Sequence, residues 1–205
     1  MAEDKFTVGE AARKKWAKPT DGGTLSVDMF NGENGGVFSK YADLVLDDRV
    51  KPQTTVAASP LDVDEWKQDG EYIYLFVRGD SIMKIGGTRT SMQERWGSYL
   101  CGFHVPERGR SGKCSVTNAH LYHTIELGLI NGEQWSVWCW KLPRVVHKVT
   151  ILGDDVDIVV QTYHAYESVC IEKFKKTVGS IPVLCMNSDP SYKGKNDKKS
   201  TPPNY

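Results

Sequence analysis

The sequence predicts an α/β fold of the α+β kind, in which a small mixed or antiparallel central sheet is flanked by helices. Three features predict it: an apolar hairpin in the middle of the chain, a capped helix directly after that hairpin, and a long amphipathic helix nearer the C-terminus. With 205 residues, of which 40% are apolar, the chain is long enough to form one substantial core.

The hairpin consists of two runs rich in β-branched and aromatic residues, joined at Gly79-Asp80. Both faces of the first run are apolar, which predicts a central strand: Tyr72, Tyr74 and Phe76 share one face, and Ile73, Leu75 and Val77 share the other. Lys84 breaks the apolar pattern of the second run. A loop centred on Gly79 would place Lys84 opposite Tyr74 on one face, whereas a two-residue turn would place them on opposite faces, so the register stays open.

A helix is predicted over residues 91–100. It starts with a capping box at 91–94, and apolar residues then recur at helical spacing to form a core-facing stripe: Met92, Trp96, Tyr99, Leu100 and Phe103. Arg95 and Tyr99 lie one turn apart along the edge of this stripe. From there a guanidinium and a phenol can reach a phosphate above the hairpin.

A second and a third helix are predicted over residues 117–130 and 163–178. The apolar face of the third is formed by Tyr163, Cys170, Ile171, Phe174 and Val178. Glu167 lies on this face, whereas Glu172 lies on the polar side. An acid on an apolar face is costly unless it is paired or coordinates a cation, so Glu167 is either a metal ligand or the partner of an arginine such as Arg95.

Further elements are predicted at both ends of the chain. Strands are expected over residues 134–142, 144–152 and 157–161, with a break at Pro143, and helices are expected over residues 8–18 and 40–48. The polar segment 188–205 is expected to be disordered.

The spacing of the hairpin and helix residues resembles that of the GIY-YIG nuclease superfamily. Tyr74 is followed ten positions later by Lys84-Ile85-Gly86, and then by Arg95 and Tyr99. This pattern is similar to the branch of type II restriction endonucleases in which lysine replaces the second signature tyrosine. The stretch 117–142 is similar to part of a phage endonuclease II, and the whole resemblance covers residues 70–179. Because the first motif reads Tyr72-Ile73-Tyr74, either tyrosine can be the signature residue.

The resemblance implies a role for each site residue. Lys84 beside Tyr74 is expected to lower the phenol pKa from its ordinary value of about 10, which would make Tyr74 a general base. Arg95 and Tyr99 would hold the scissile phosphate, and Glu167 would hold Mg²⁺, which Mn²⁺ can replace. His123 is a candidate auxiliary group, with an ordinary helix residue as the alternative.

The charge is unevenly distributed along a chain whose net charge is zero. Residues 72–205 carry 17 basic and 12 acidic side chains, whereas residues 1–71 carry 9 and 14. Basic residues gather in three places: Lys84, Arg89 and Arg95, the loop that contains Arg108, Arg110 and Lys113, and the tail 193–199. We expect Arg89, Arg108, Arg110 and Lys113 to contact DNA phosphates, with solvated loops as the alternative interpretation.

These features predict a Mg²⁺-dependent endonuclease that hydrolyses double-stranded DNA, most simply a type II restriction enzyme. A phage-borne or homing endonuclease of the same superfamily and a non-catalytic nucleic-acid-binding module of the same fold are the alternatives. The predicted organisation is an N-terminal extension at 1–70 for dimerisation or DNA recognition, a nuclease domain at 71–187 and a tail at 188–205. A cut in both strands by subunits with one site each implies a homodimer or a higher homo-oligomer.

The cellular setting is inferred from what the sequence lacks. Its apolar runs are only as long as strands, and its start has no apolar signal segment, so no membrane span and a cytoplasmic location are expected. The five cysteines form no Cys-x-x-Cys pair, which favours reduced, packed thiols over a disulfide framework or a zinc site.

Overall fold

The computed structural model describes residues 14, 16–18, 20, 22–32, 36–47, 56–104 and 115–186. Its centre is a five-stranded sheet with the strand order β2-β1-β5-β3-β4, in which every pairing is antiparallel. The strands are β1 (Ser39–Leu46), β2 (Val56–Pro60), β3 (Tyr72–Arg78), β4 (Ser81–Thr88) and β5 (Trp135–Lys141). β3 is central, as its two apolar faces predicted, and β4 is an edge strand.

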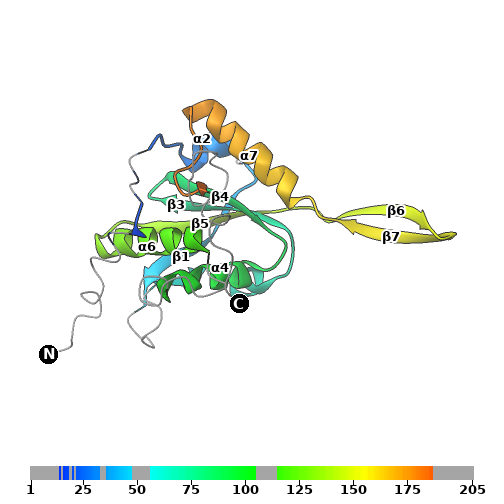
Figure 1. Ribbon diagram of the computed structural model, residues 1–205, viewed down its shortest axis with the longest axis horizontal. Coiled ribbons are helices and arrows are strands. Elements are labelled where there is room, and N and C mark those ends of the chain that lie inside the picture. Colours follow the sequence, from blue (N-terminus) through cyan, green and yellow to red (C-terminus); the bar gives the residue numbers. More distant parts are fainter. Residues whose placement is uncertain are drawn as a thin grey trace, which may run out of the picture.

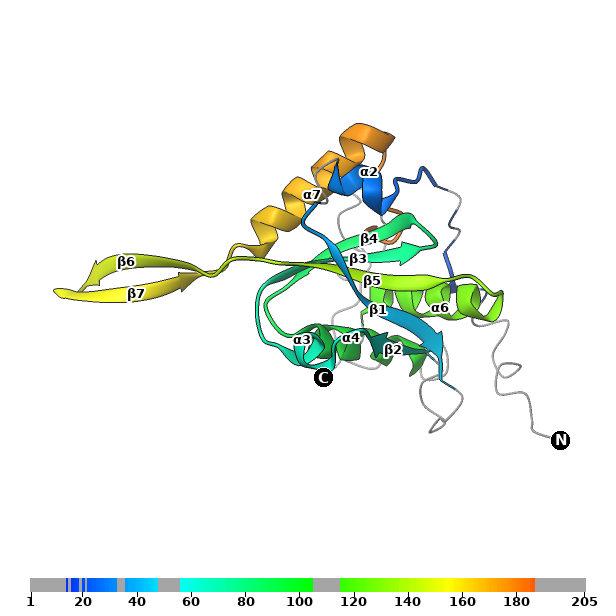
Figure 2. The ribbon, with the colours of Figure 1, turned by 180° about the vertical axis from the view of Figure 1, so that it is seen from behind.

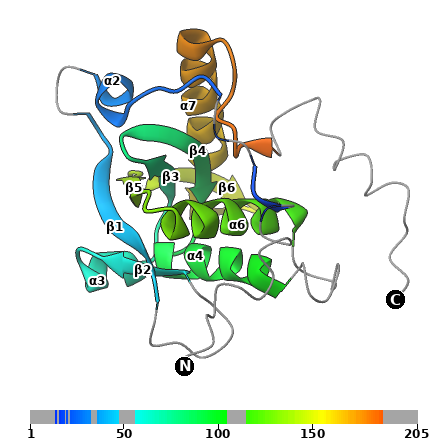
Figure 3. The same ribbon diagram turned by 90° about the vertical axis from the view of Figure 1, so that its left-hand side faces the viewer.

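Helices cover both faces of the sheet, which confirms the predicted fold class (Figure 3). One face carries α7 (Tyr163–Val178) and the short α2 (Val27–Asn31), and the other carries α4 (Met92–Leu100), α6 (Val116–Ile130), α3 (Val63–Lys67) and the 3-10 turn η1 (Cys101–His104). The helices predicted over 91–100, 117–130 and 163–178 are therefore confirmed to within one residue at each end. None of the described helices is long and apolar enough to cross a bilayer.

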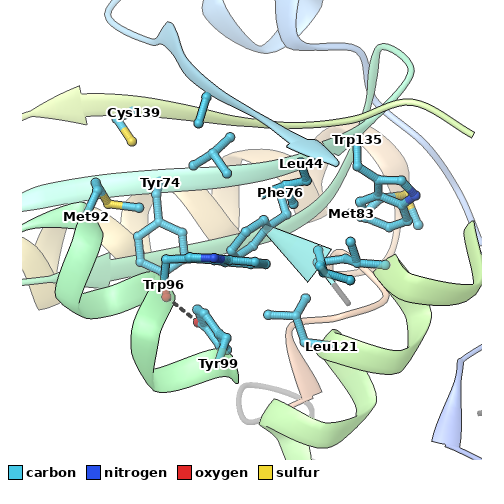
Figure 4. Packing of buried hydrophobic residues seen from close by; sticks show 14 of the residues in the cluster. Leu44, Tyr74, Phe76, Met83, Met92, Trp96, Tyr99, Leu121, Trp135 and Cys139 are labelled. Carbon is cyan, nitrogen blue, oxygen red and sulfur yellow. Dashed lines mark hydrogen bonds between the residues drawn. The ribbon is translucent and has the colours of Figure 1, made fainter. Parts of the chain in front are cut away.

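Alternation along β3 divides the core into two layers. Tyr72, Tyr74 and Phe76 pack with the side chains of α4 and α6, and Ile73, Leu75 and Val77 pack with those of α7. Figure 4 shows part of the first layer, in which Tyr74, Phe76, Trp96 and Tyr99 pack against one another between β3 and α4. All of these β3 side chains are at most 1% exposed, so the strand fixes its residues rigidly.

The strand pair β6 (Val145–Ile151) and β7 (Asp154–Val160) forms a separate two-stranded ribbon that projects far from the rest of the molecule (Figures 1 and 2). Pro143 lies between β5 and β6, as predicted, and β7 starts three residues before the predicted strand. The ribbon connects the end of the sheet to the start of α7.

The helix predicted over 40–48 is wrong, because this segment forms β1. Ala42 and Leu44 are buried while Asp43 and Val45 are not, and β1 pairs with β5 on one side and β2 on the other. Pairing on both sides satisfies the backbone along the strand and overrides a weak local helix signal. Through β1 and β2, residues 39–46 and 56–60 of the segment 1–70 belong to the central sheet. The helix predicted over 8–18 lies largely outside the described residues.

Candidate active site

A β-bulge decides where Lys84 lies. Gly79 and Asp80 form a two-residue turn, since Arg78 pairs with Ser81 and Val77 with Ile82. The register then shifts by one residue, so that Phe76 pairs with Lys84 and Tyr74 with Gly86. The extra residue, Met83, restores Lys84 to the face that carries Tyr74. The structure thus combines two features that the sequence offered as alternatives: the two-residue turn, and Lys84 on the same face as Tyr74.

On this face, two phenols and a guanidinium form a compact buried cluster. The hydroxyl oxygens of Tyr74 and Tyr99 lie 2.6 Å apart (Figure 4). Arg95 Nε donates to the Tyr74 hydroxyl at 2.8 Å, and its Nη2 donates to the Tyr99 hydroxyl at 2.8 Å. Both tyrosines are buried, at 0% and 2% exposure. The spacing of Tyr74, Arg95 and Tyr99 in the sequence therefore corresponds to direct contact in the fold.

Tyr72 shares the face of Tyr74 but points to a different place. Its hydroxyl donates to the backbone carbonyl of Gln68 at 3.0 Å, near the end of α3. No described contact joins Tyr72 to Arg95 or Tyr99. Of the two candidate signature tyrosines, Tyr74 is therefore the one that lies in the cluster.

The expected lowering of the Tyr74 pKa is wrong for the free protein. Burial raises the pKa of Tyr74 well above its ordinary value of 10, and the neighbouring Tyr99 raises it further, while Arg95 and Lys84 act to lower it. Burial raises the pKa of Tyr99 as well, against the lowering effect of Arg95. Desolvation of a phenolate outweighs the two nearby cations, so both phenols are neutral near pH 7. Burial acts to lower the pKa of Arg95, but the two phenol oxygens raise it, and the guanidinium stays charged.

Glu167 reaches the same strand from the opposite side. A Cβ atom added to Gly86 would overlap the Tyr74 hydroxyl, whereas one added to Gly87 would lie 3.0 Å from Glu167 Oε2 and 2.6 Å from Tyr163 Cδ2. Consecutive strand residues face opposite sides, so the two groups flank β4 at adjacent positions. Because consecutive Cα atoms are about 3.8 Å apart, the phenol oxygen and the carboxylate lie within about 12 Å of each other. The two glycines are what allows both to approach the strand.

The Glu167 carboxylate has no hydrogen bond or ion pair within the described part of the chain. Its side chain is half-buried, between the half-buried Tyr163 and the buried Ile171, whereas Glu172 is exposed. The alternative in which Glu167 pairs with Arg95 does not apply, because Arg95 donates to the hydroxyls of Tyr74 and Tyr99 and forms no ion pair with Glu167. A half-buried carboxylate without a neutralising partner is suited to a cation that arrives from outside.

The segment after α7 covers the outer edge of β4 up to the two glycines. Leu184 N donates to Met83 O at 3.0 Å, and the Cys185 thiol both accepts from Ile85 N and donates to Ile85 O, each at 3.2 Å. Lys84 Nζ donates to Leu184 O at 3.2 Å. No sequence pattern indicated Cys185. Burial raises the pKa of its thiol, while Lys84 acts to lower this pKa and Glu167 acts to raise it.

Beyond this cover, no described residue hydrogen-bonds to the Gly87 backbone on the outer edge of β4. Ile85 directs its N–H and C=O away from β3 to Cys185, and the backbone groups of every second residue point the same way. Gly87 therefore directs its N–H outward as well. A phosphate at this point would meet a backbone donor between the Tyr74 cluster and Glu167.

The other candidate residues lie elsewhere or outside the described residues. His123 is buried in α6, where its Nδ1 lies 3.0 Å from Glu126 Oε2, and no described contact joins it to Tyr74, Arg95 or Tyr99. Arg89 follows β4 directly and is exposed. Arg108, Arg110 and Lys113 fall in residues 105–114, outside the described part of the chain.

The residues present fit a divalent cation held by one carboxylate. Among the described residues no three or more His, Cys, Asp or Glu side chains gather to form a metal cage. Mg²⁺ does not require one, since it commonly binds through one or two carboxylates, substrate phosphate oxygens and several waters. Glu167, unpaired and beside the open backbone of Gly87, satisfies this requirement.

The structure resembles two solved nucleases. The first is the restriction endonuclease HPY188I in complex with product DNA, which is 23% identical and aligns over 82% of this chain and 95% of its own, with a TM-score of 0.46. The second is a mutant of EndoII from bacteriophage T4, 19% identical over 67% of this chain and 87% of its own, with a TM-score of 0.44.

These are the two kinds of nuclease that the sequence also resembles. No protein-family model and no curated protein sequence matches the chain. Both identities are below 25% and both TM-scores below 0.5, so the role of each residue is inferred from the local geometry alone.

Proposed function

We propose that the protein is a Mg²⁺-dependent endonuclease that hydrolyses phosphodiester bonds in double-stranded DNA, in the manner of a type II restriction endonuclease. One observation carries the proposal. Tyr74, Tyr99 and Arg95 form a hydrogen-bonded cluster on one side of the open end of β4, and the unpaired carboxylate of Glu167 lies on the other side of the same two glycines. A phosphodiester at this edge would contact both sides.

The phosphate would be held by charge and by backbone donors. Arg95 uses Nε and Nη2 for the two phenols, which leaves Nη1 without a partner among the described residues and able to donate to a phosphate oxygen. The outward N–H of Gly87 supplies a second donor. Because the tyrosines fix the guanidinium, little conformational freedom is lost when the phosphate binds.

Tyr74 would act as the general base in its phenolate form. The attacking water forms the new P–O bond, its proton moves to Tyr74 Oη, and the P–O bond to the leaving sugar oxygen breaks. Arg95 and Lys84 favour the phenolate, while burial opposes it, so only a small fraction of the free protein carries this form at neutral pH. When bound at Glu167, Mg²⁺ would polarise the phosphate and neutralise charge on the leaving oxygen, and Mn²⁺ can take its place.

The remaining roles follow from the same proposal. Arg89, Arg108, Arg110 and Lys113 would contact the DNA backbone and make binding depend strongly on salt. Residues 1–70 would add dimerisation or base recognition to the nuclease domain at 71–187. A phage-borne or homing endonuclease would use the same chemistry, whereas a binding module of this fold would bind DNA without cleaving it.

The deciding experiment compares two acids on one helix. Supercoiled plasmid is incubated with Mg²⁺, with and without chelator, using the wild-type protein, Glu167→Gln and the matched control Glu172→Gln. We expect wild-type cleavage to stop with chelator, Glu167→Gln to lose at least about a hundredfold in rate while keeping DNA affinity, and Glu172→Gln to resemble the wild type. Metal-dependent cleavage that persists in Glu167→Gln would overturn the assignment, and DNA binding without cleavage by the wild type would favour the binding module.

A further inference from the structure

The projecting ribbon of β6 and β7 has one apolar face that the rest of the described chain leaves uncovered. Residues that pair across the ribbon share a face, and on one face the side chains are mostly aliphatic. This apolar ribbon face consists of Val145, His147, Val149, Ile151, Asp154, Val156, Ile158 and Val160. Ile151, Val156 and Ile158 are 47%, 38% and 41% exposed. An isolated two-stranded ribbon is only marginally stable in water, so a contiguous apolar face of this kind indicates an interaction surface.

The opposite face of the ribbon is mostly polar. Lys148 pairs with Asp157 there, and the Thr150 hydroxyl donates to Asp155 Oδ1 at 2.7 Å. The ribbon is therefore amphipathic, with a solvent side and a side that requires a cover. Only the apolar ribbon face requires a partner, because the polar side chains of the other face contact solvent and one another.

Charge along the ribbon favours a second copy of this chain as that cover. The tip carries Asp154 and Asp155, whereas the base carries Arg144, with Lys141 and Arg89 beside it. Asp69 and Glu71 line the same place, so three cations against two acids leave the base net positive by one. An acidic tip repels the phosphates of nucleic acid. Two ribbons packed face to face and running in opposite directions place each acidic tip against the basic base of the other copy. A two-fold axis produces this match twice.

The tip and the base also match in shape. Leu152 at the turn is fully exposed and has φ 55°, a conformation that no other described non-glycine residue adopts. At the base of the ribbon lies a cavity of about 450 Å³, whose lining includes Leu142, Pro143 and Val160 together with Arg144. In the two-fold arrangement, the leucine of one copy reaches this cavity in the other.

We propose that the apolar ribbon face is a homodimer interface, in which the ribbons of two copies pack antiparallel and each Leu152 enters the cavity at the base of its partner. The dimer would present two copies of the β4 site to one DNA duplex, which suits a cut in both strands. This part of the inference rests on the proposed function. Dimerisation is measured without DNA, so a result against the dimer can be distinguished from a result against the nuclease.

The test uses two residues on opposite faces of the ribbon. Ile158 and Val146 are both β-branched and are 41% and 46% exposed, but only Ile158 lies on the apolar ribbon face, and neither lines the cavity. Sedimentation of the full chain over a range of concentrations should show a wild-type dimer. We expect Ile158→Lys to weaken dimerisation at least about tenfold and Val146→Lys to leave it nearly unchanged.

A turn variant and a set of charge reversals keep the test independent of ribbon stability. Leu152→Asn places at positive φ a residue that tolerates it, so it should preserve the turn while weakening the dimer. Asp154→Lys and Arg144→Asp should each weaken the dimer, and the double variant should recover it, because the charges are exchanged across the two-fold axis.

Three results would overturn the proposal. They are a wild-type chain that is monomeric at every concentration, equal effects of Ile158→Lys and Val146→Lys, and charge reversals that fail to compensate each other. A monomer whose DNA affinity rises on Ile158→Lys would also overturn it, since the face would then contact nucleic acid.

Discussion

Lys84 lies on the same face of the sheet as Tyr74, although a two-residue turn joins their strands. Without the bulge at Met83, the Gly79-Asp80 turn would pair Lys84 with Leu75 and direct its amine into the other core layer. One inserted residue thus keeps a cation beside a buried phenol. The same shift pairs Tyr74 with Gly86, where the missing Cβ makes room for its hydroxyl.

The two tyrosines of β3 should differ in function despite sharing a face. Tyr74→Phe removes the proposed general base and should lower plasmid cleavage at least about a hundredfold. Tyr72→Phe removes only the bond to Gln68 O and should leave cleavage close to wild type. Tyr72→Phe deletes one hydrogen bond and should lower the free energy of unfolding by about 1 kcal/mol, measured by urea denaturation. Tyr74→Phe deletes the two bonds to Tyr99 and Arg95 and should lower it by about 1 to 3 kcal/mol.

Tyr72→Phe is the control for Tyr74→Phe, because both changes remove a phenol hydroxyl from a buried side chain on the same face of β3. Loss of cleavage in both variants would indicate damage to the fold, and loss in Tyr72→Phe alone would assign the base to Tyr72.

Gly86 should not tolerate a side chain. The Cβ of Gly86→Ala would overlap the buried hydroxyl of Tyr74, so Tyr74 or β4 must shift, at a cost of about 1 to 3 kcal/mol in the free energy of unfolding and with loss of cleavage. Gly97→Ala is the control, because a Cβ there meets nothing within 4 Å and the residue lies inside α4. That change should stabilise the protein by about 0.5 to 1 kcal/mol. A Gly86→Ala variant as stable and active as the wild type would contradict the packing of Tyr74 on β4.

The buried phenols should make the protein sensitive to alkali. Burial raises the pKa of Tyr74 and of Tyr99, so above about pH 10 the unfolded chain loses these protons while the folded chain retains them. Their contribution to stability is therefore complete below about pH 10 and decreases as the pH rises towards the folded pKa values. Each phenol contributes at most about 1.4 kcal/mol per pH unit to this decrease.

Urea denaturation from about pH 8 to about pH 11 measures this effect. The double variant Tyr74→Phe/Tyr99→Phe should show a shallower alkaline decrease in the free energy of unfolding than the wild type. Equal slopes in the two proteins would show that the phenols do not remain neutral on folding.

Local patterns in the sequence determined the main helices and the central strand. The boundaries of α7 and the central position of β3 were predictable because a helical stripe and a two-sided apolar run require particular partners. The segment 40–48 was not, since its alternation is short and only pairing with β5 and β2 makes it a strand. Cys185 gave no signal, because its contacts with Ile85 join residues 100 positions apart.

By itself, the sequence determined which chemical groups are present and their spacing: Tyr74, Lys84, Arg95 and Tyr99 within one hairpin and helix, and Glu167 on the apolar side of α7. Only the tertiary structure decided that Tyr74 rather than Tyr72 contacts Arg95, and that Lys84 lies on the same face as Tyr74. It also decided that burial raises the pKa of Tyr74 by more than Arg95 and Lys84 lower it. The physical reason is that spacing fixes local direction, whereas a one-residue bulge and the exclusion of water depend on everything packed around the strand.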